Sequence, residues 1–370
     1  MAEPLNNHFG DDIPRIIADM ILSVAPAFPA DEFVRSVLDG YADLALMDRG
    51  RKIARALHRH LPEDYDEAIE ILLASLAQAP APRQDGSGMA AFLFLPHTMF
   101  VGEFGLPHFE TSMRAQFRLT QVFTAEFSIR PFLMQHPEAT LDRLRVWATD
   151  PNRHVRRLVS EGSRPRLPWA PRLPAFQADP RPVLELLDIL KDDPELYVRR
   201  SVANNLNDIG KDHPTLLAET AARWMGNAPE RRRWVIRHGL RSAVKHGDAQ
   251  ALAVLGFSDA ATVAVEDVAM TPSHVPLGAA VTLEFLMINT GDHPQRVLVD
   301  WRVHFVKSNG KTSPKVFKGK ILALAPQETL PLRKTISLAE MTTRRHYAGT
   351  HRVDVLVNGR PLSLGTFEVG

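Results

Sequence analysis

The sequence has no cysteine among its 370 residues, and it has no apolar run that approaches a membrane span of roughly 18 residues. The first absence excludes disulfide bonds, thiolate nucleophiles and zinc sites with cysteine ligands. The opening segment MAEPLNNHFGDD also lacks the basic and apolar stretches of a signal peptide. We therefore expect a cytoplasmic protein with no membrane partner.

Familiar catalytic motifs are missing as well. The sequence contains no HExxH, no GxSxG and no glycine-rich phosphate loop. His58 and His60 are two positions apart on a predicted helix, so their side chains point in different directions. These absences predict a protein without metal or cofactor. They leave carboxylates, arginines and one tryptophan as the candidate functional groups.

Charge is distributed unevenly along the chain, although the net charge is only +1. Residues 1–140 hold 11 Lys+Arg against 19 Asp+Glu, and residues 141–250 hold 20 against 14. Residues 251–370 hold 13 against 10. A basic part joined to an acidic part favours a polyanionic partner for the basic part. The alternative is a chance imbalance of solvated faces.

The hydrophobic pattern changes once along the chain. Apolar residues recur at three- and four-residue spacing through residues 11–79, and the helical pattern resumes near Ala90 and continues to about Leu255. Beyond about Ser258, seven short segments alternate or are β-branched, with turn residues between them. This predicts a helical domain over residues 1–257 and an immunoglobulin-like β-sandwich over residues 258–370.

A repeat lies inside the helical part. DPNRHVRRLVSE begins at Asp150, DPELYVRRSVAN begins at Asp193, and PERRRWVIRHGLRS from Pro229 is a degenerate third copy. A period near 40 residues with paired helices is typical of a HEAT-like α-solenoid. In each complete copy the aspartate is a predicted helix N-cap, followed by a proline in the first turn.

The first copy carries a polar stripe. Arg153, Arg157 and Glu161 are spaced four apart, beside the face that is predicted to be buried. Gly162 is a predicted C-cap, so Glu161 ends its helix, where the helix dipole disfavours a carboxylate. An ordinary ion pair with Arg157 is one explanation. In the second copy Arg200 and Asn204 occupy the positions of Arg157 and Glu161, so the pattern recurs on one side of the array.

A second carboxylate occupies an apolar environment. Glu126 falls within a predicted helical stripe of Leu119, Val122 and Phe123. Burying an unpaired carboxylate is costly, so Glu126 needs a partner or a function. Its alternatives are a tilted helix that lets it reach water, or an ion pair with Arg130 one turn later.

Trp169 stands in a basic, proline-rich turn. Pro165 and Pro168 restrict the backbone, which holds Trp169 in a defined position. A tryptophan is most often a core residue, but the basic surroundings equally favour a functional position.

Three segments together resemble the AlkC branch of the AlkC/AlkD alkylpurine DNA glycosylases. They are FLPHTMFVGEFGLPHFETSMRAQFRLTQVFTAEFSIRPFL, DPNRHVRRLVSEGSRPRLPWA and VRRSVANNLNDIGKDHP. The resemblance covers essentially the whole helical part. The resemblance implies a HEAT-like repeat enzyme that excises positively charged N-alkylated bases from DNA without flipping them. Some members of this branch also carry a C-terminal immunoglobulin-like domain.

The resemblance also implies roles for individual residues. Glu161 and Glu126 would be the active-site carboxylates, and Trp169 would lie beside the deoxyribose of the lesion. Arg157 and Arg164 would bind the DNA backbone or position a carboxylate. Beyond what the resemblance implies, the basic stripe predicts phosphate contacts from a larger set of residues: Arg153, Arg157, Arg164, Arg166, Arg199, Arg200 and Asn204.

The β-sandwich offers a further candidate DNA contact. The predicted hairpin VKSNGKTSPKVFKGK is rich in lysine and has Ser-Asn-Gly at its tip, and Lys311 and Lys315 both follow that tip. Such a turn can lie along phosphates or enter a groove. The alternative is that these lysines protect an exposed sheet edge from aggregation.

The sequence therefore predicts a monomeric, monofunctional DNA glycosylase for base excision repair. Its expected partner is double-stranded DNA that carries 3-methyladenine or 3-methylcytosine. A catalytically silent HEAT-repeat protein that binds nucleic acid or another partner is the alternative, with Glu161 only balancing charge.

Overall fold

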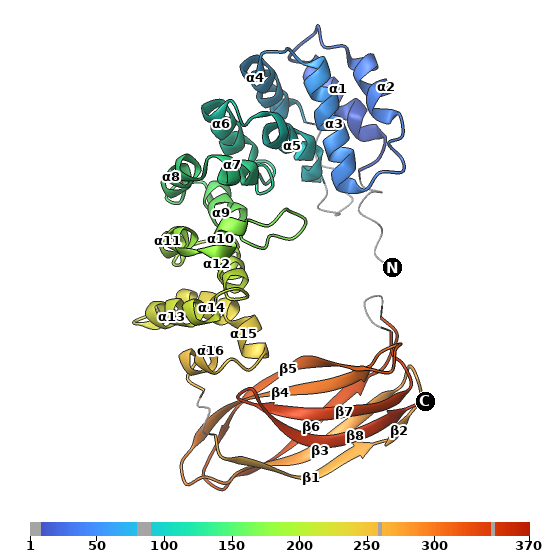
Figure 1. The fold of residues 1–370 in the computed structure, drawn as a ribbon, viewed down its shortest axis with the longest axis vertical. Coiled ribbons are helices and arrows are strands. Elements are labelled where there is room, and N and C mark those ends of the chain that lie inside the picture. The colour runs from blue at the N-terminus through green and yellow to red at the C-terminus, as the bar shows by residue number, and fades with distance from the viewer. Residues whose placement is uncertain (1–8, 80–89, 258–260, 342–344) are drawn as a thin grey trace. The chain divides into compact units, whose positions relative to one another are not determined.

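The computed structural model describes residues 9–79, 90–257, 261–341 and 345–370 (Figure 1). Internal contacts divide the chain into two compact units, Met1–Asp212 and His213–Gly370. The domain boundary predicted at residues 257/258 borders residues 258–260, which lie outside the described residues. By contacts, the last four helices group with the strands. Within the described ranges, no helix is both long and apolar enough to cross a membrane.

In its described residues, the first unit has only helical elements, as the three- and four-residue periodicity predicts. Figure 1 shows part of it as two rows of helices, with α6, α8 and α11 in one row and α7, α9 and α12 in the other. The helices and 3₁₀ segments in chain order are α1 (Asp12–Leu22), α2 (Ala30–Leu38), α3 (Leu46–His60), α4 (Tyr65–Ser75), η2 (Leu76–Gln78), η3 (Ala90–Phe94), α5 (Leu95–Phe104), α6 (Phe109–Leu119), α7 (Ile129–Gln135), α8 (Pro137–Trp147), α9 (Arg153–Gly162), α10 (Pro174–Ala178), α11 (Arg181–Leu190) and α12 (Leu196–Ile209).

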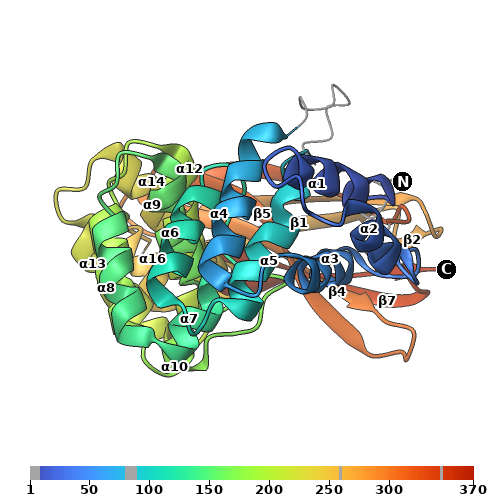
Figure 2. The same cartoon turned by 90° about the horizontal axis from the view of Figure 1, so that it is seen from above.

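The two complete repeats form α9 and α12, which lie side by side (Figures 1 and 2). Val155, Leu158 and Val159 on α9 are fully buried, as their spacing predicts. The two helices also share polar contacts, because the Ser160 hydroxyl donates to the Ser201 hydroxyl at 2.7 Å. The repeat is therefore a packing unit, and the predicted helical solenoid is confirmed.

The ends of α9 differ from the expectation. The N-cap is Asn152, whose side chain accepts from the backbone N–H of His154, while the Asp150 carboxylate accepts from the N–H of Asn152. The predicted aspartate cap was therefore wrong by two positions. Gly162 is the last helical residue and not a left-handed cap. A Cβ there would lie 2.5 Å from Cγ2 of Ile129, so close packing against α7 requires glycine.

A buried histidine in α5 predicts a pH dependence of stability. His97 is 1% exposed, and burial lowers its pKa to about 4. Below pH 6.5 the unfolded chain takes up a proton that the folded chain does not, so stability is lost as pH falls from 6.5 towards 4. The expected loss is about 2 kcal/mol at pH 5. Thermal melts at pH 7 and pH 5 should show a smaller decrease for His97→Gln than for the parent; an equal decrease would contradict this role.

The second unit joins four helices to two β-sheets. One sheet has strand order β1-β3-β6 and the other β2-β8-β7-β4-β5, with only the β2–β8 pair parallel among the described strands. The elements are α13 (Pro214–Met225), α14 (Glu230–Gly239), α15 (Arg241–Lys245), α16 (Ala249–Val254), β1 (Val263–Thr271), β2 (His274–Val275), β3 (Ala280–Asn289), β4 (Gln295–Val306), β5 (Thr312–Leu324), β6 (Thr329–Ser337), β7 (Gly349–Val357) and β8 (Arg360–Val369).

The inner faces of the two sheets form the core of a β-sandwich. Buried apolar side chains from both sheets form this core, and they include Phe285, Trp301 and Phe367. The predicted sandwich is therefore confirmed. The strand that the sequence did not suggest is β2, which has only two residues and so shows no alternation.

A small apolar cluster joins α16 to the sandwich. Leu252 on α16, Phe257 and Leu298 on β4 pack together. Arg296 stacks its guanidinium 4.6 Å from the centre of the Phe257 ring and donates to the carbonyl of Leu255. These contacts explain why the last helices group with the strands.

Candidate active site

The two predicted carboxylates meet at Arg157, although they are 35 positions apart in the sequence. The Arg157 guanidinium is 2.8 Å from Oε2 of Glu126 and 3.7 Å from Oε1 of Glu161. Burial alone would lower the pKa of Arg157, but the two carboxylates outweigh it and raise this pKa above its ordinary value. Arg157 thus bridges the two anionic groups.

Glu126 is not on a helix, contrary to the expectation. α6 ends at Leu119 and α7 begins at Ile129, and Val122 in the segment between them is 43% exposed. The Glu126 carboxylate accepts from the Thr124 hydroxyl at 2.9 Å, and Arg157 also donates to that hydroxyl. The ion-pair partner is therefore Arg157, and the proposed pairing with Arg130 was wrong.

Glu161 lies near the end of α9 and is 6% exposed. Its Oε1 accepts from Arg164 at 2.6 Å, and its Oε2 accepts from the Ser201 hydroxyl on α12 at 2.6 Å. These donors and Arg157 suit a carboxylate, and they offset the unfavourable helix dipole. The side chain is consequently fixed from three directions.

A chain of alternating charges continues from Glu161. Arg164 donates through Nε to Asp208 at 2.8 Å, and Lys211 donates to the other oxygen of Asp208 at 2.8 Å. The Arg164 guanidinium is buried between the two carboxylates. Burial opposes the charged form, but Glu161 and Asp208 raise the pKa of Arg164. This geometry favours the carboxylate-positioning role for Arg164 over the backbone-binding one.

Tyr197 covers the other side of Arg157. Its ring centre lies 5.3 Å from the Arg157 guanidinium carbon, and His154 meets the same ring edge-on. Tyr197 is 41% exposed, so it adds an accessible aromatic surface next to the carboxylates. No feature of the sequence marks Tyr197 as functional, because an aromatic residue on a helix also occurs for ordinary packing reasons.

Trp169 is 65% exposed and has a φ of 64°. It occupies the third position of a turn over residues 167–170, closed by a hydrogen bond from the N–H of Ala170 to the carbonyl of Leu167. With Pro168 before it, this geometry is a type II turn, in which the third residue is normally glycine or asparagine. The backbone is therefore strained in order to present a tryptophan to solvent.

The remaining predicted DNA-binding residues of the first unit differ in their surroundings. Arg153 and Arg200 are exposed, and Arg153 lies 3.8 Å from Glu195. Arg166 forms a two-pronged ion pair with Asp212. Arg199 donates to the carbonyls of its own turn, residues 193 and 194, as Arg156 does in the first repeat. Asn204 is half-buried. Phosphate contacts from this set stay predictions.

The lysine hairpin lies in the second unit, between β4 and β5. Its turn closes with a hydrogen bond from the N–H of Lys307 to the carbonyl of Lys311. The Lys311 side chain is exposed, whereas Lys315 is half-buried with its ammonium 5.3 Å from the centre of the Phe317 ring. Both lysines stay predicted DNA contacts.

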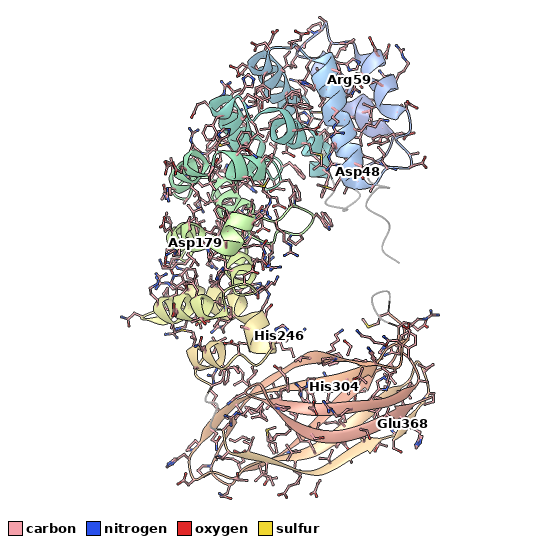
Figure 3. The ribbon with its side chains drawn as sticks, in the orientation of Figure 1. Asp48, Arg59, Asp179, His246, His304 and Glu368 are labelled. Carbon is pink, nitrogen blue, oxygen red and sulfur yellow. The ribbon has the colours of Figure 1, made fainter. Side chains whose placement is uncertain are left out.

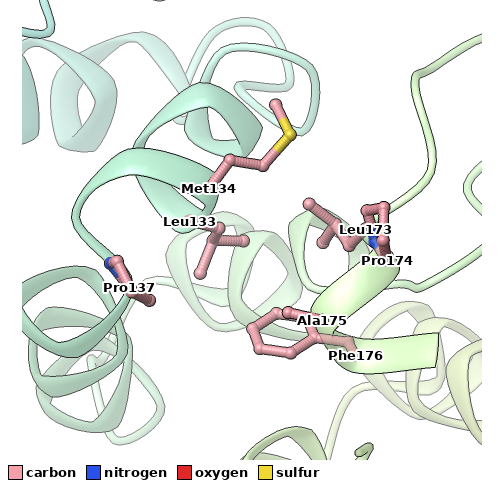
Figure 4. Close-up of a pocket in the computed structure, with 7 residues that line it drawn as sticks. All are labelled: Leu133, Met134, Pro137, Leu173, Pro174, Ala175 and Phe176. Carbon is pink, nitrogen blue, oxygen red and sulfur yellow. The ribbon is translucent and has the colours of Figure 1, made fainter. Parts of the chain in front are cut away.

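An apolar hollow of about 260 Å³ lies elsewhere on the first unit (Figure 4). Side chains from α7, α8 and α10 line it, and none of them is polar: Leu133, Met134, Pro137, Leu173, Pro174, Ala175 and Phe176. Its side chains offer no hydrogen-bond donor or charge to a nucleobase. Within the described ranges, no cluster of His, Asp and Glu could hold a metal ion.

Replacing Glu126 by glutamine should test the paired carboxylates. The new amide would keep the contact with Thr124 but leave Arg157 free to neutralise Glu161. We expect base excision to decrease about tenfold, which corresponds to roughly 1.4 kcal/mol. We expect a melting temperature equal to or above that of the parent, because a half-buried carboxylate is removed. Glu138→Gln is the control, because Glu138 is an exposed residue on α8. A strongly destabilised variant with normal turnover would mark Glu126 as structural.

Comparisons with known proteins agree on the whole chain. Residues 47–242 match the family model described as DNA alkylation repair enzyme, and residues 264–370 match the C-terminal Ig-like domain of protein YhaZ. YhaZ of Bacillus subtilis (strain 168), named as uncharacterised, is 37% identical over 99% of each chain.

A solved structure covers the same length. It is the alkylpurine DNA glycosylase AlkC of Pseudomonas fluorescens bound to DNA containing an abasic site analog. That protein is 38% identical, covers 100% of both chains and gives a TM-score of 0.89. The helical unit, the Ig-like domain and these matches together show that the chain belongs to the family of DNA alkylation repair enzymes, as an AlkC-like glycosylase.

Proposed function

We propose that this protein hydrolyses the N-glycosidic bond of positively charged N-alkylated bases in double-stranded DNA, above all 3-methyladenine and 3-methylcytosine. The observation that carries the proposal is that Glu126 and Glu161 both contact Arg157. Arg157 and Glu161 lie on α9, and the chain continues from α9 into the turn that exposes Trp169. The reaction releases the free base and leaves an abasic site. No metal or cofactor takes part in it.

Hydrolysis of the N-glycosidic bond of an N-alkylated base is favoured by carboxylates and by an aromatic ring near the deoxyribose. An N-alkylated base already carries positive charge, so it leaves without strong protonation. The deoxyribose then develops oxocarbenium character, as in glycoside hydrolysis. A fixed carboxylate stabilises that cation, and it can orient or deprotonate the attacking water. The negative face of Trp169 can stabilise the cationic sugar or base.

We further propose that the target base is not flipped into a deep pocket. Most glycosylases extrude their target into a snug cavity. Here the hollow described above has no polar side chain to recognise a base, whereas Trp169 is largely exposed. A charged leaving group needs little recognition by hydrogen bonds, which is consistent with catalysis at an open surface.

A duplex with one 3-methyladenine or 3-methylcytosine tests the activity directly. The parent protein should release the free methylated base, detected by mass spectrometry, and alkali should then cleave the strand at the abasic site. A duplex with unmodified adenine or cytosine is the control. Binding without base release would instead favour the alternative, a non-catalytic HEAT-repeat protein that uses Glu161 only to balance charge.

DNA binding should weaken steeply as salt concentration rises. Each phosphate contact that is lost should reduce the slope of log affinity against log salt by about 0.9. Arg200→Gln is the most direct test, because Arg200 is exposed on α12, and this variant should reduce the slope. Lys311→Ala with Lys315→Ala tests the hairpin in the same way.

Arg59→Gln is the matched control for this titration. Arg59 is an exposed arginine near the end of α3, far along the chain from the candidate site (Figure 3). It should leave the slope unchanged. An unchanged slope for Arg200→Gln and for the double lysine variant would contradict their proposed phosphate contacts.

A further inference from the structure

Glu161 and Trp169 belong to different local structures. Glu161 lies near the end of α9, and Trp169 lies on a turn in the irregular segment between α9 and α10. For both to act on one nucleotide, the segment over residues 163–173 must hold a fixed shape. Its own backbone supplies few contacts, namely the turn at Trp169 and a hydrogen bond from the N–H of Leu173 to the carbonyl of Pro165.

Arg130 on α7 binds the end of α9 and two points of this segment. Its Nη1 donates to the carbonyls of Gly162 at 3.0 Å and Arg164 at 2.8 Å, and its Nε and Nη2 both donate to the carbonyl of Pro171. Arg130 is 1% exposed. One guanidinium therefore joins the residue after Glu161 to the carbonyl two residues beyond Trp169.

The chemistry of these contacts requires arginine. A guanidinium presents several N–H donors in a rigid plane, whereas a lysine ammonium cannot reach three carbonyls in these directions. The carbonyl of Gly162 is also at the negative end of the α9 dipole, where a cation is favourable. Burial and then the nearby Arg164 lower the pKa of Arg130 to about 10, so the group is still charged at neutral pH.

We propose that Arg130 is the positioning residue that fixes Glu161 and Trp169 relative to one another; this rests on the proposed glycosylase function. The strained backbone of Trp169 supports the assignment, because a non-glycine residue with positive φ persists only where its surroundings hold it. Arg130 reaches neither water nor the open surface, so it acts through the backbone and does not contact DNA.

Arg130→Lys tests this role, because it keeps the positive charge and removes the planar set of N–H donors that binds the three carbonyls. Single-turnover excision should slow about 100-fold, the scale of a 1 Å misplacement at a reacting centre. DNA affinity should stay within about twofold, because a loss confined to the chemical step leaves binding unchanged. Arg145→Lys is the control, since Arg145 forms exposed ion pairs with Asp142 on its own helix α8 and with Glu185 on α11.

A second measurement is independent of activity. The chain has five tryptophans, so labelling with 5-fluorotryptophan gives five fluorine NMR resonances, and Trp169→Phe identifies the one from Trp169. In Arg130→Lys the Trp169 resonance should shift or broaden while the other four stay in place. If the parent protein releases no methylated base, the proposed function fails, whereas the fluorine spectrum still tests the placement of Trp169.

The remaining outcomes are decisive. A normal excision rate in Arg130→Lys, or a slow rate with an unchanged Trp169 resonance, overturns the proposal. So does a uniform change of all five resonances, which would make Arg130 a general core residue. If Arg130→Lys does not fold, Arg130→Gln places no charge in the site and is judged by the same criteria. Failure of both variants to fold also overturns the proposal.

Discussion

Replacing Glu161 by glutamine should reduce the rate of base excision by about 100- to 1000-fold, which corresponds to roughly 2.7–4 kcal/mol of lost transition-state stabilisation. The substitution keeps the size of the side chain, and the amide oxygen can still accept from Ser201 or Arg164. What is lost is the negative charge that would face the oxocarbenium ion. Single-turnover release of 3-methyladenine, measured with saturating protein, gives the rate of the chemical step.

Two controls separate this effect from damage to the fold. Glu185→Gln removes an exposed carboxylate on α11 and should leave excision unchanged. DNA affinity and melting temperature of Glu161→Gln should stay near those of the parent, because its neighbours keep hydrogen-bond partners. Excision at the parent rate would show that Glu161 is not the group that stabilises the cation.

Replacing Trp169 by glycine should slow base excision while leaving the stability of the protein equal to or above that of the parent. Glycine adopts the positive φ of this turn position without strain, so the variant should be at least as stable as the parent. Little packing is lost, because 65% of the tryptophan is exposed. Loss of an aromatic face beside the nucleotide should slow excision roughly 5- to 150-fold, by analogy with base stacking worth about 1–3 kcal/mol.

Thermal melts and single-turnover rates on the same samples test this prediction. Trp169→Phe is the matched control, because it keeps an aromatic ring and the strained backbone together. It should retain more activity than Trp169→Gly and gain no stability. A glycine variant with lower stability and normal excision would show that Trp169 serves the fold.

Part of the site is visible in the sequence because it is local. Arg157 and Glu161 are four apart on one helix, and that spacing alone brings their charges within 3.7 Å. The repeat likewise predicts that α9 and α12 have equivalent positions. The contacts from Ser201, Asp208 and Tyr197 are different, because they depend on how α12 packs against α9, which no spacing within one helix specifies.

The segment around Glu126 shows why helical periodicity misleads. Leu119, Val122 and Phe123 have the spacing of a helix face, and no proline or glycine interrupts them. The chain nevertheless leaves the helix after Leu119, and Val122 is exposed. The tertiary contacts of Thr124 and Glu126 with Arg157 compete with helix formation there, and they connect residues more than 30 positions apart.

The role of Arg130 could not be predicted from the sequence for a different reason. Its partners are backbone carbonyls, which every residue possesses, so no residue type in the sequence marks them. The only local clue is its place next to Ile129, which packs tightly on Gly162. A buried arginine whose partners are all main-chain atoms is therefore recognisable only after the chain has folded.

The polar contacts between the two repeats have a consequence for how the protein opens. Arg156 on α9 binds Asp193, which precedes α12, and Asn205 on α12 donates to the carbonyl of Ser160 and to the hydroxyl of Ser163. Separating the helices would break all these contacts at once. The two helices therefore form one cooperative unit of local unfolding, and the carboxylate site between them is lost or kept as a whole.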